Sequence, residues 1–432
     1  MKWKISAVVV ATCVFGVLTP IQSNAQGSAE DQPRYNVQDL GALGGTFSSA
    51  FGINNLSWVT GAANLEGDQT EHPVLWRNGS IIDLGTLGGE NGSAGFPLKN
   101  NLGLVPAFAQ TSEMDPLGEN WNFTCSLSGN LCEGTDLVQH GFVWVDGRKV
   151  PMPTLGGHNG AVWGANDWGE VVGLAETPTV DSNCVAPQVV DYEAVLWTPF
   201  NNRIQALPPY PGDTVGAAVG INDYGQVVGA TGSCAPVSPA IGAHAVLWEN
   251  GNVKDLGNLG GKFSNVAYAI NNHGQVVGIS DLSGDKTAHA FFWQNGTLTD
   301  LGTLPGDFLS VAFSINNKAQ VVGESCDVNF NCRAFLWQKG KMIDLNSLIP
   351  ANSPLYLLSA NDLNDRGEIV GQAFDQSTGA APAFLTIPCD EEEANDENCH
   401  TIAQNEIGIG KQKTVLPARV REQLRRRPVF GR

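Results

Sequence analysis

Four histidines occupy equivalent positions along the chain, and their side-chain type is the one that most often binds transition metals or transfers protons. His72, His140, His244 and His289 each stand four residues before a tryptophan. A metal needs its ligands within about 2–2.2 Å of one point. Because copies of one position in a repeated structure are held apart by the repetition, we expect a structural hydrogen bond at each histidine and no metal site.

Asn and Asp residues recur in a second pattern, typified by Asn222-Asp223-Tyr224-Gly225. Their carboxylate and amide oxygens are the hard ligands that calcium prefers. The same residues also form Asx turns, and glycine supplies the positive φ that such turns need. A tight hairpin accounts for every copy, so we predict turns and no cofactor, with calcium as the alternative.

The cysteines form a third set with possible chemistry. Eight cysteines remain once Cys13 is excluded as part of a leader segment, and none has the Cys-x2-Cys spacing typical of zinc sites. An even number of cysteines in an exported chain favours disulfides. We expect pairs within single loops, between neighbouring units and after the last unit: Cys125 with Cys132, Cys326 with Cys332, Cys184 with Cys234, and Cys389 with Cys399.

These residues are carried by an internal repeat. Residues 264–304 contain Ile270-Asn271-Asn272-His273-Gly274, then a β-branched segment, then an aromatic segment that ends at Trp293. Similar units occur seven times, marked by Trp76, Trp144, Trp197, Trp248, Trp293 and Trp337, with Thr386 at the seventh position. A large ring present in nearly every unit is typical of packing between units. A sugar-binding platform is the alternative, although one site would need only one copy.

Each unit contains four short strand signals, and Asn295-Gly296 is typical of a two-residue hairpin turn. Four antiparallel strands in about 45–50 residues is the length of one propeller blade. The sequence therefore predicts an all-β fold, a seven-bladed β-propeller of four-stranded antiparallel blades, over residues 34–388.

The last unit lacks a fourth strand, because Cys389-Asp390-Glu391 follows Pro388. The chain begins with a surplus strand signal, Tyr35 to Leu40, which resembles the fourth strand of the other units. We therefore predict that the N-terminal strand completes the last blade and closes the ring, which leaves no open sheet edge.

The repeated motifs resemble those of the extracellular HAF-repeat family, named for a His-Ala-Phe tripeptide. His289-Ala290-Phe291 matches the tripeptide, and Ile-Asn-x-x-Gly-x-Val-Val-Gly and Asp-Leu-Gly-x-Leu-Gly-Gly recur along residues 34–388. The resemblance implies a secreted repeat protein, and it implies no activity and no catalytic residue.

The two ends of the chain differ from the repeats. Residues 1–25 have the charged start, apolar run and small residues of a signal peptide, so we expect a secreted, extracellular or periplasmic protein with no transmembrane segment in the mature chain. Residues 389–410 form an acidic segment that we expect a disulfide to staple. Residues 411–432 form a basic tail, for which we predict extended or partly helical structure that packs weakly, if at all, on the body.

The charge and the absence of certain motifs limit the classes of function that this chain fits. The formal net charge is −19, and most of the basic residues outside the body lie in the tail, so the body should repel nucleic acid. The sequence contains no Gly-x-Ser-x-Gly and no His-Glu-x-x-His motif. We predict a non-catalytic binding or scaffolding propeller whose ligand is an extracellular protein or glycan. The alternative is a glycan-acting hydrolase or lyase, which would require paired carboxylates among the acidic residues.

The long loops indicate the face of the propeller on which we expect a ligand to bind. Tight turns join the first two and the last two strands of each unit, so the long, variable second-to-third loops should gather on one face. The longest of these loops, within residues 106–139, supplies our candidate ligand-contacting residues: Asp115, Glu119, Trp121, Phe123 and Asp136.

Overall fold

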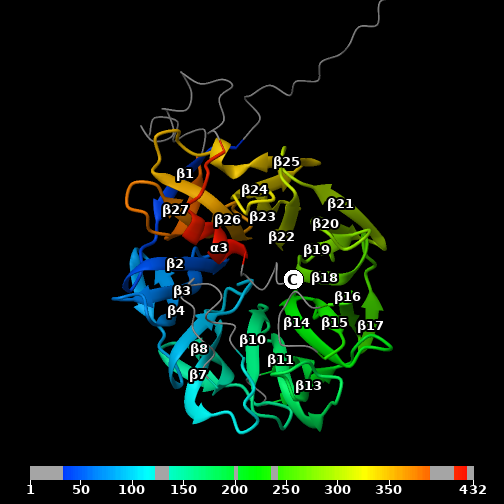
Figure 1. Cartoon of the computed structure of the whole chain (residues 1–432). Coiled ribbons are helices and arrows are strands. Elements are labelled where there is room, and N and C mark those ends of the chain that lie inside the picture. Colours follow the sequence, from blue (N-terminus) through cyan, green and yellow to red (C-terminus); the bar gives the residue numbers. More distant parts are fainter. Residues whose placement is uncertain (1–32, 122–135, 199–202, 235–241, 390–412, 426–432) are drawn as a thin grey trace, which may run out of the picture. The chain divides into compact units, whose positions relative to one another are not determined.

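In the computed structural model, residues 33–121, 136–198, 203–234, 242–389 and 413–425 are described. Within these residues the strands form seven antiparallel four-stranded sheets, which stand as blades around a central axis (Figure 1). The predicted fold class is confirmed.

The first six blades follow the chain in order, each with its strands paired consecutively. Blades 1 to 3 are β2 (Gly44–Ile53), β3 (Val59–Leu65), β4 (Glu71–Arg77) and β5 (Ser80–Asp83); β6 (Gly88–Ala94), β7 (Val105–Met114), β8 (Leu137–Val145) and β9 (Arg148–Pro151); and β10 (Gly160–Ala165), β11 (Val171–Val180), β12 (Val190–Thr198) and β13 (Arg203–Leu207). Blades 4 to 6 are β14 (Val215–Ile221), β15 (Val227–Gly232), β16 (His244–Glu249) and β17 (Asn252–Asp255); β18 (Gly260–Ile270), β19 (Val276–Leu282), β20 (Ala288–Gln294) and β21 (Thr297–Gly302); and β22 (Leu309–Ile315), β23 (Val321–Cys326), β24 (Cys332–Gln338) and β25 (Lys341–Asp344).

The seventh blade joins the two ends of the repeat region. It consists of β26 (Leu355–Leu363), β27 (Ile369–Asp375), β28 (Ala383–Pro388) and the N-terminal strand β1 (Tyr35–Asp39). β1 runs antiparallel to β28, with Tyr35 opposite Pro388 and Asp39 opposite Phe384. The predicted closure of the ring by the N-terminal strand is therefore confirmed.

A glycine on the second strand of a blade permits a close backbone contact. In blade 5 a register shift in β18 brings the Val266 carbonyl oxygen within 1.9 Å of where a Cβ on Gly278 would stand. The equivalent glycines of other blades, such as Gly61 and Gly173, meet a carbonyl at 2.0 Å in the same way. The bulge thus requires glycine at the end of the repeated Val-Val-Gly motif.

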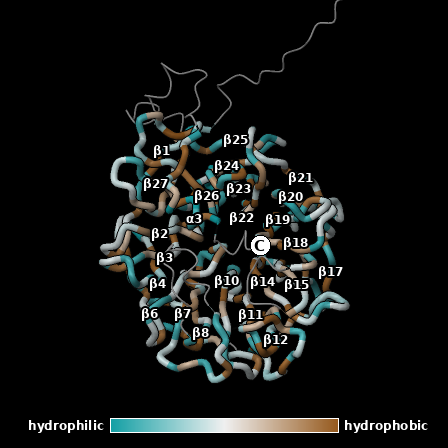
Figure 2. Tube along the Cα trace, viewed as in Figure 1, coloured by the Kyte–Doolittle hydropathy of each residue, from teal (hydrophilic) through white to brown (hydrophobic). Residues whose placement is uncertain are grey.

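The hydrophobic core lies between the blades, where the strands carry the most apolar residues (Figure 2). Trp76, Trp197, Trp248 and Trp293 are each at most 5% exposed. The indole nitrogens of Trp197 and Trp248 donate to the carbonyls of Pro153 and Pro208, which lie in the linkers between the preceding blade and the tryptophan's own blade. This burial supports the predicted role of the recurring tryptophans in packing between blades.

The C-terminal tail packs more closely than we predicted. α3 (Ala418–Arg425) places Val420 and Leu424, together with the preceding Leu416, in a buried cluster with Tyr356 and Leu358 of β26. Lys413 forms ion pairs with Asp307 and Asp327. The prediction of weak packing was wrong, because Val420 and Leu424, four residues apart on one face of a short helix, are buried together with Leu416 just before it.

Three of the predicted domain features lie wholly or partly outside the described residues. These are the signal peptide (1–25), most of the acidic segment (389–410) and the ends of the basic tail (411–432). The helices that are described include none long and apolar enough to cross a membrane.

Candidate functional site

Each blade has a tight turn between its first and second strands, and an Asn side chain shapes it. In blade 4, Asn222 Oδ1 accepts hydrogen bonds from the backbone N–H groups of Tyr224 and Gln226, at 3.1 and 3.0 Å. Gly225 completes the turn with φ of 71°. The predicted Asx turns are therefore present. We call the side of the ring that carries them the hairpin face, and the opposite side, with the second-to-third loops, the loop face.

The first Asn of each turn also links neighbouring blades. Asn222 Nδ2 donates to the carbonyl of Asn271 in blade 5 at 3.0 Å. The same bond joins five other pairs of turns: Asn54 to Asn100, Asn166 to Asn222, Asn271 to Asn316, Asn316 to Asn364, and Asn364 to Asn54. Asn100 departs from the pattern, because its Nδ2 donates to Leu104 of its own turn.

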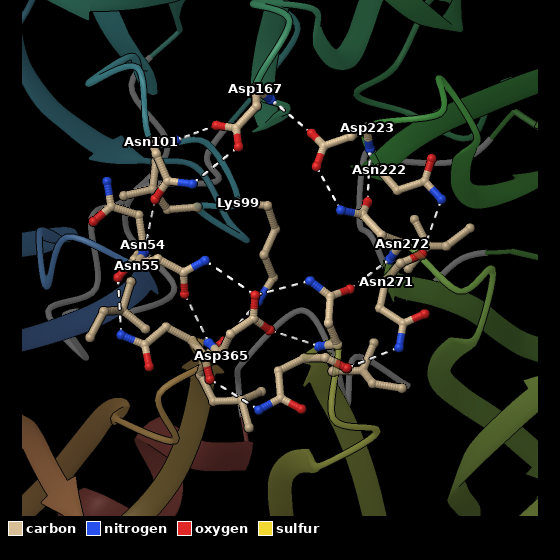
Figure 3. A pocket seen from close by; sticks show the side chains of 18 of the residues that line it. Asn54, Asn55, Lys99, Asn101, Asp167, Asn222, Asp223, Asn271, Asn272 and Asp365 are labelled. Atoms are coloured by element: carbon tan, nitrogen blue, oxygen red, sulfur yellow. Dashed lines mark hydrogen bonds between the residues drawn. The ribbon is translucent and has the colours of Figure 1, made fainter.

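The second residue of each turn forms a closed ring of hydrogen bonds around the axis (Figure 3). In every blade its backbone N–H donates to the Oδ1 atom of its counterpart in the next blade, at 2.5–3.1 Å. The donors and acceptors, in order, are Asn55 to Asn101, Asn101 to Asp167, Asp167 to Asp223, Asp223 to Asn272, Asn272 to Asn317, Asn317 to Asp365, and Asp365 to Asn55. We call these seven residues the Asx ring.

The Asx ring surrounds a cavity of about 130 Å³ on the axis. Lys99 extends into its middle (Figure 3). The Lys99 ammonium donates to Asp362 Oδ1 at 2.6 Å and to the Leu363 carbonyl at 2.9 Å. Since an ammonium has three N–H donors, this arrangement uses two and leaves one for the cavity. The result is an axial pocket lined by amides, carboxylates and one cation.

The axial pocket has a closed floor. Aromatic rings meet beneath it: the centroids of Phe96 and Tyr268 lie 6.0 Å apart, and those of Tyr268 and Phe313 lie 5.8 Å apart. Phe96 belongs to blade 2 and Tyr268 to blade 5, on the far side of the ring, so their contact fills the axis. A ligand entering from the hairpin face would therefore meet a cup and not a continuous channel.

Hydrogen bonds and a nearby positive charge keep Asp365 ionised. Burial acts to raise the pKa of Asp365, but hydrogen bonds from Asn317 and Asn55 and the charge of Lys99 hold that pKa below its usual value. Both oxygens of Asp167 and of Asp223 also accept N–H donors from the neighbouring turns. These hydrogen bonds fix the two side chains in place, and since each carboxylate oxygen has two lone pairs, each keeps an acceptor site for a ligand.

The third position of each turn directly follows a member of the Asx ring and lies just outside the residues that line the axial pocket, and we call these side chains its rim. These side chains are exposed and differ from blade to blade: Leu56, Leu102, Trp168, Tyr224, His273, Lys318 and Arg366. Trp168 and Tyr224, on consecutive blades, are 73% and 76% exposed. The repeat thus fixes the first two turn positions and leaves the third free to vary.

The candidate residues of the long loop lie elsewhere. Asp115, Glu119 and Trp121 are 6%, 0% and 2% exposed, whereas Asp136 is exposed. Phe123 lies outside the described residues. Asp115 accepts hydrogen bonds from the backbones of Leu117 and Glu119. The three buried side chains thus organise the base of the loop, and ligand contact by this segment stays a prediction.

Glu119 belongs to a buried carboxyl pair that spans two blades. It shares a hydrogen bond with Glu176 of β11, and Gln188 donates to both side chains. Burial, followed by this hydrogen bond and the charge of Glu119, raises the pKa of Glu176 to about 8. One of the two carboxyls therefore carries a proton at neutral pH. Our sequence reasoning named Glu119 but missed its partner, which lies 57 residues further along the chain.

The recurring histidines make the structural contacts we expected. Nδ1 of His72 lies 2.9 Å from Asp83, Nδ1 of His289 lies 2.9 Å from Asp300, and Nδ1 of His244 lies 2.8 Å from Asp213. Each contact stays beside its own blade, so the histidines do not converge. Burial lowers the pKa of His140, which accords with a structural role in that blade too.

Two of the predicted disulfides are present among the described residues. Cys184–Cys234 joins the loops of blades 3 and 4, and Cys326–Cys332 closes the loop within blade 6. Cys389 is also disulfide-bonded. Its predicted partner Cys399 and the predicted pair Cys125–Cys132 lie outside the described residues.

Comparisons with known proteins add little about function. A family model described as a protein of unknown function (DUF3466) matches residues 215–384. No curated protein matches the chain.

Solved structures resemble the chain only distantly. An oligogalacturonate lyase from Vibrio parahaemolyticus is 9% identical over 84% of this chain and 96% of its own, with a TM-score of 0.46. A puromycin-hydrolyzing peptidase from Mycobacterium tuberculosis is 12% identical over 82% of this chain and 56% of its own, with a TM-score of 0.47. A gluconolactonase from Xanthomonas campestris is 8% identical over 83% and 96%, with a TM-score of 0.34. Likenesses at this level carry no functional argument.

Proposed function

We propose that this protein is a secreted, non-catalytic binding propeller whose ligand enters the axial pocket on the hairpin face. The observation that carries the proposal is the Asx ring. Seven turns fix their polar side chains to one another, so the pocket is already formed before any ligand arrives. Pre-organised polar groups lose little entropy on binding, which favours recognition.

The same groups are poorly suited to catalysis. A general acid needs a pKa raised toward the working pH, whereas Asp365 is held ionised. The Asp167 and Asp223 oxygens are engaged by neighbouring turns. The pocket therefore offers hydrogen bonds to a ligand from side chains that are already fixed in place.

The alternative of a glycan-acting hydrolase or lyase draws support from one feature, the Glu119–Glu176 pair. Glycosidase carboxyls stand about 5–5.5 Å apart or further, so that a sugar or a water can fit between them. Glu119 and Glu176 instead share a hydrogen bond, and both side chains are 0% exposed. This arrangement favours a structural pair over a catalytic one.

Export is part of the proposal. Disulfides within and between blades suit an oxidising compartment, and residues 1–25 have the pattern of a signal peptide. We infer that the ligand is an extracellular molecule that the mature protein meets after secretion.

The test separates binding from turnover. The mature protein is incubated with a panel of plant and microbial polysaccharides and with a chromogenic ester, and both retention on the immobilised polymer and release of new reducing ends or chromophore are measured. We expect retention on at least one polymer without product release. Product release by the pure protein would contradict the proposal, and so would the absence of retention on every polymer together with failure to capture any extracellular protein.

A further inference from the structure

Exposed aromatic side chains stand beside the axial pocket on only one arc of its rim. Trp168 and Tyr224 occupy the third turn position of blades 3 and 4, at 73% and 76% exposure. The Trp168 indole nitrogen donates to the carbonyl of Asp223 at 2.8 Å, so the ring is held across the neighbouring turn. Two adjacent turns of the Asx ring therefore present large aromatic surfaces to solvent.

What distinguishes these two rings from other exposed aromatic side chains, such as Phe263 at 73% exposure, is that they stand on consecutive turns next to the Asx ring. The residue before each exposed ring is an aspartate of the Asx ring, Asp167 or Asp223. An aromatic face next to hydrogen-bonding carboxylates matches the two surfaces of a pyranose. Its C–H bonds carry partial positive charge that the aromatic face attracts, and its hydroxyls donate to carboxylates.

We propose that Trp168 and Tyr224 form a stacking platform for a neutral saccharide whose hydroxyls reach Asp167, Asp223 and the free N–H of Lys99. This inference rests on the proposed function and names the class of ligand for the same pocket. Lys99 supplies a donor where the two aspartates supply acceptors, so a hydroxyl can be satisfied in either role.

Charge distinguishes neutral sugars from charged ones. Asp167, Asp223 and Asp365 surround the mouth of the pocket, and the whole chain has a formal net charge of −19, so a uronate would be repelled. A cationic amino sugar would meet Lys99 inside the pocket and Lys318 and Arg366 on the opposite arc of the rim. A neutral polyhydroxylated chain meets neither of these charge repulsions.

The experiment is calorimetric titration of the mature protein with defined hexasaccharides. The probes are cellohexaose, xylohexaose, mannohexaose and laminarihexaose as neutral sugars, hexagalacturonate as an acidic sugar, and hexaglucosamine as a basic sugar. We expect a neutral sugar to bind best. W168A and Y224A should each weaken that binding about tenfold, equivalent to about 1.4 kcal/mol. Both side chains are exposed, so the melting temperature should stay unchanged.

Two further variants separate the role of the aromatic platform from that of the pocket. F263A removes an aromatic ring that is 73% exposed on the loop face, and it should leave binding unchanged. D223N tests the pocket itself and should weaken binding. If D223N weakens binding but W168A and Y224A do not, the pocket binds and the platform is wrong. Preference for a charged sugar, an effect of F263A equal to that of W168A, or no binding of any hexasaccharide would each overturn the inference.

Discussion

Single carboxyl groups in this protein differ in whether hydrogen bonds or burial sets their pKa. At Asp365 on the hairpin face, hydrogen bonds from neighbouring turns outweigh burial and hold the pKa low. At Glu176 and Glu71 burial dominates: it raises the pKa of Glu176 to about 8 and that of Glu71 well above its ordinary value. A raised carboxyl pKa of this kind makes the stability of the fold depend on pH.

Glu176 should make stability fall as pH rises. The unfolded chain loses this proton near the ordinary value of 4.5, whereas the folded chain keeps it up to about 8. Between these values the folded state binds more protons, so its stability decreases with pH and levels off above about pH 8. Glu176→Gln imitates the protonated carboxyl. We expect the melting temperature of the natural protein to fall between about pH 5 and about pH 8 by several degrees more than that of the variant.

Glu90→Gln is the control for this measurement, because Glu90 is exposed. It should leave the pH dependence of the melting temperature as it is in the natural protein. Scanning calorimetry measures the melting temperatures. If the melting temperature fell equally with pH in the natural protein and in Glu176→Gln, Glu176 would ionise normally.

At the scale of elements, the tail helix α3 is part of the folded body. Val420 is 3% exposed and Val415, five residues earlier, is 77% exposed. Val420→Ala should therefore destabilise the protein by about 2 kcal/mol, whereas Val415→Ala should change stability by less than about 0.5 kcal/mol. Chemical denaturation of the two variants provides the comparison. If Val420→Ala and Val415→Ala were equally stable, the tail would be loosely packed, as the sequence suggested.

The strands were readable from the sequence because each repeat carries its own turn signals. In blades 4 and 5 Asn-x-x-Gly and Asn-Gly mark both hairpins, other blades keep at least part of this pattern, and the β-branched residues between the turns fit a buried, pleated strand. The tail was harder to read, since eight residues give a weak helical period and what stabilises the helix is the buried surface of Tyr356 and Leu358.

The sequence did not point to the axial pocket, for a reason of architecture. Long loops attracted attention because they vary, yet the first strand of each blade lies innermost, so its short turn is what reaches the axis. A turn residue such as Asp223 looks purely local in one unit. Its bonds to Asp167 and Asn272 appear only when neighbouring blades are placed side by side. The sequence carried one signal of this face of the molecule. Trp168 and Tyr224 stand at the third turn position, where the turn itself requires no particular residue.

At the scale of the whole molecule, the ring is closed twice. β1 completes the last blade beside β28, and Asp365 and Asn364 carry the turn contacts from blade 7 to blade 1. Tyr35, at the start of β1, is 1% exposed within the blade 7 core. Closure therefore combines strand pairing, burial and the Asx ring.

Deletion of residues 26–40 should lower the melting temperature sharply and promote aggregation, because β28 would become an open edge. Deletion of residues 26–32 is the matched control and should have little effect, since it leaves β1 intact. Thermal unfolding followed together with light scattering measures both outcomes. Unchanged unfolding of the longer deletion would mean that β1 contributes nothing to closure.

The most direct test of the central claim, that the ligand binds on the axis of the hairpin face, is hydrogen–deuterium exchange with and without the neutral hexasaccharide that binds best. We predict slower exchange on binding in the turns at 54–58, 166–170 and 222–226, with the loop face at 176–190 and 324–332 unaffected. Protection confined to the loop face, with the turns unchanged, would contradict the account.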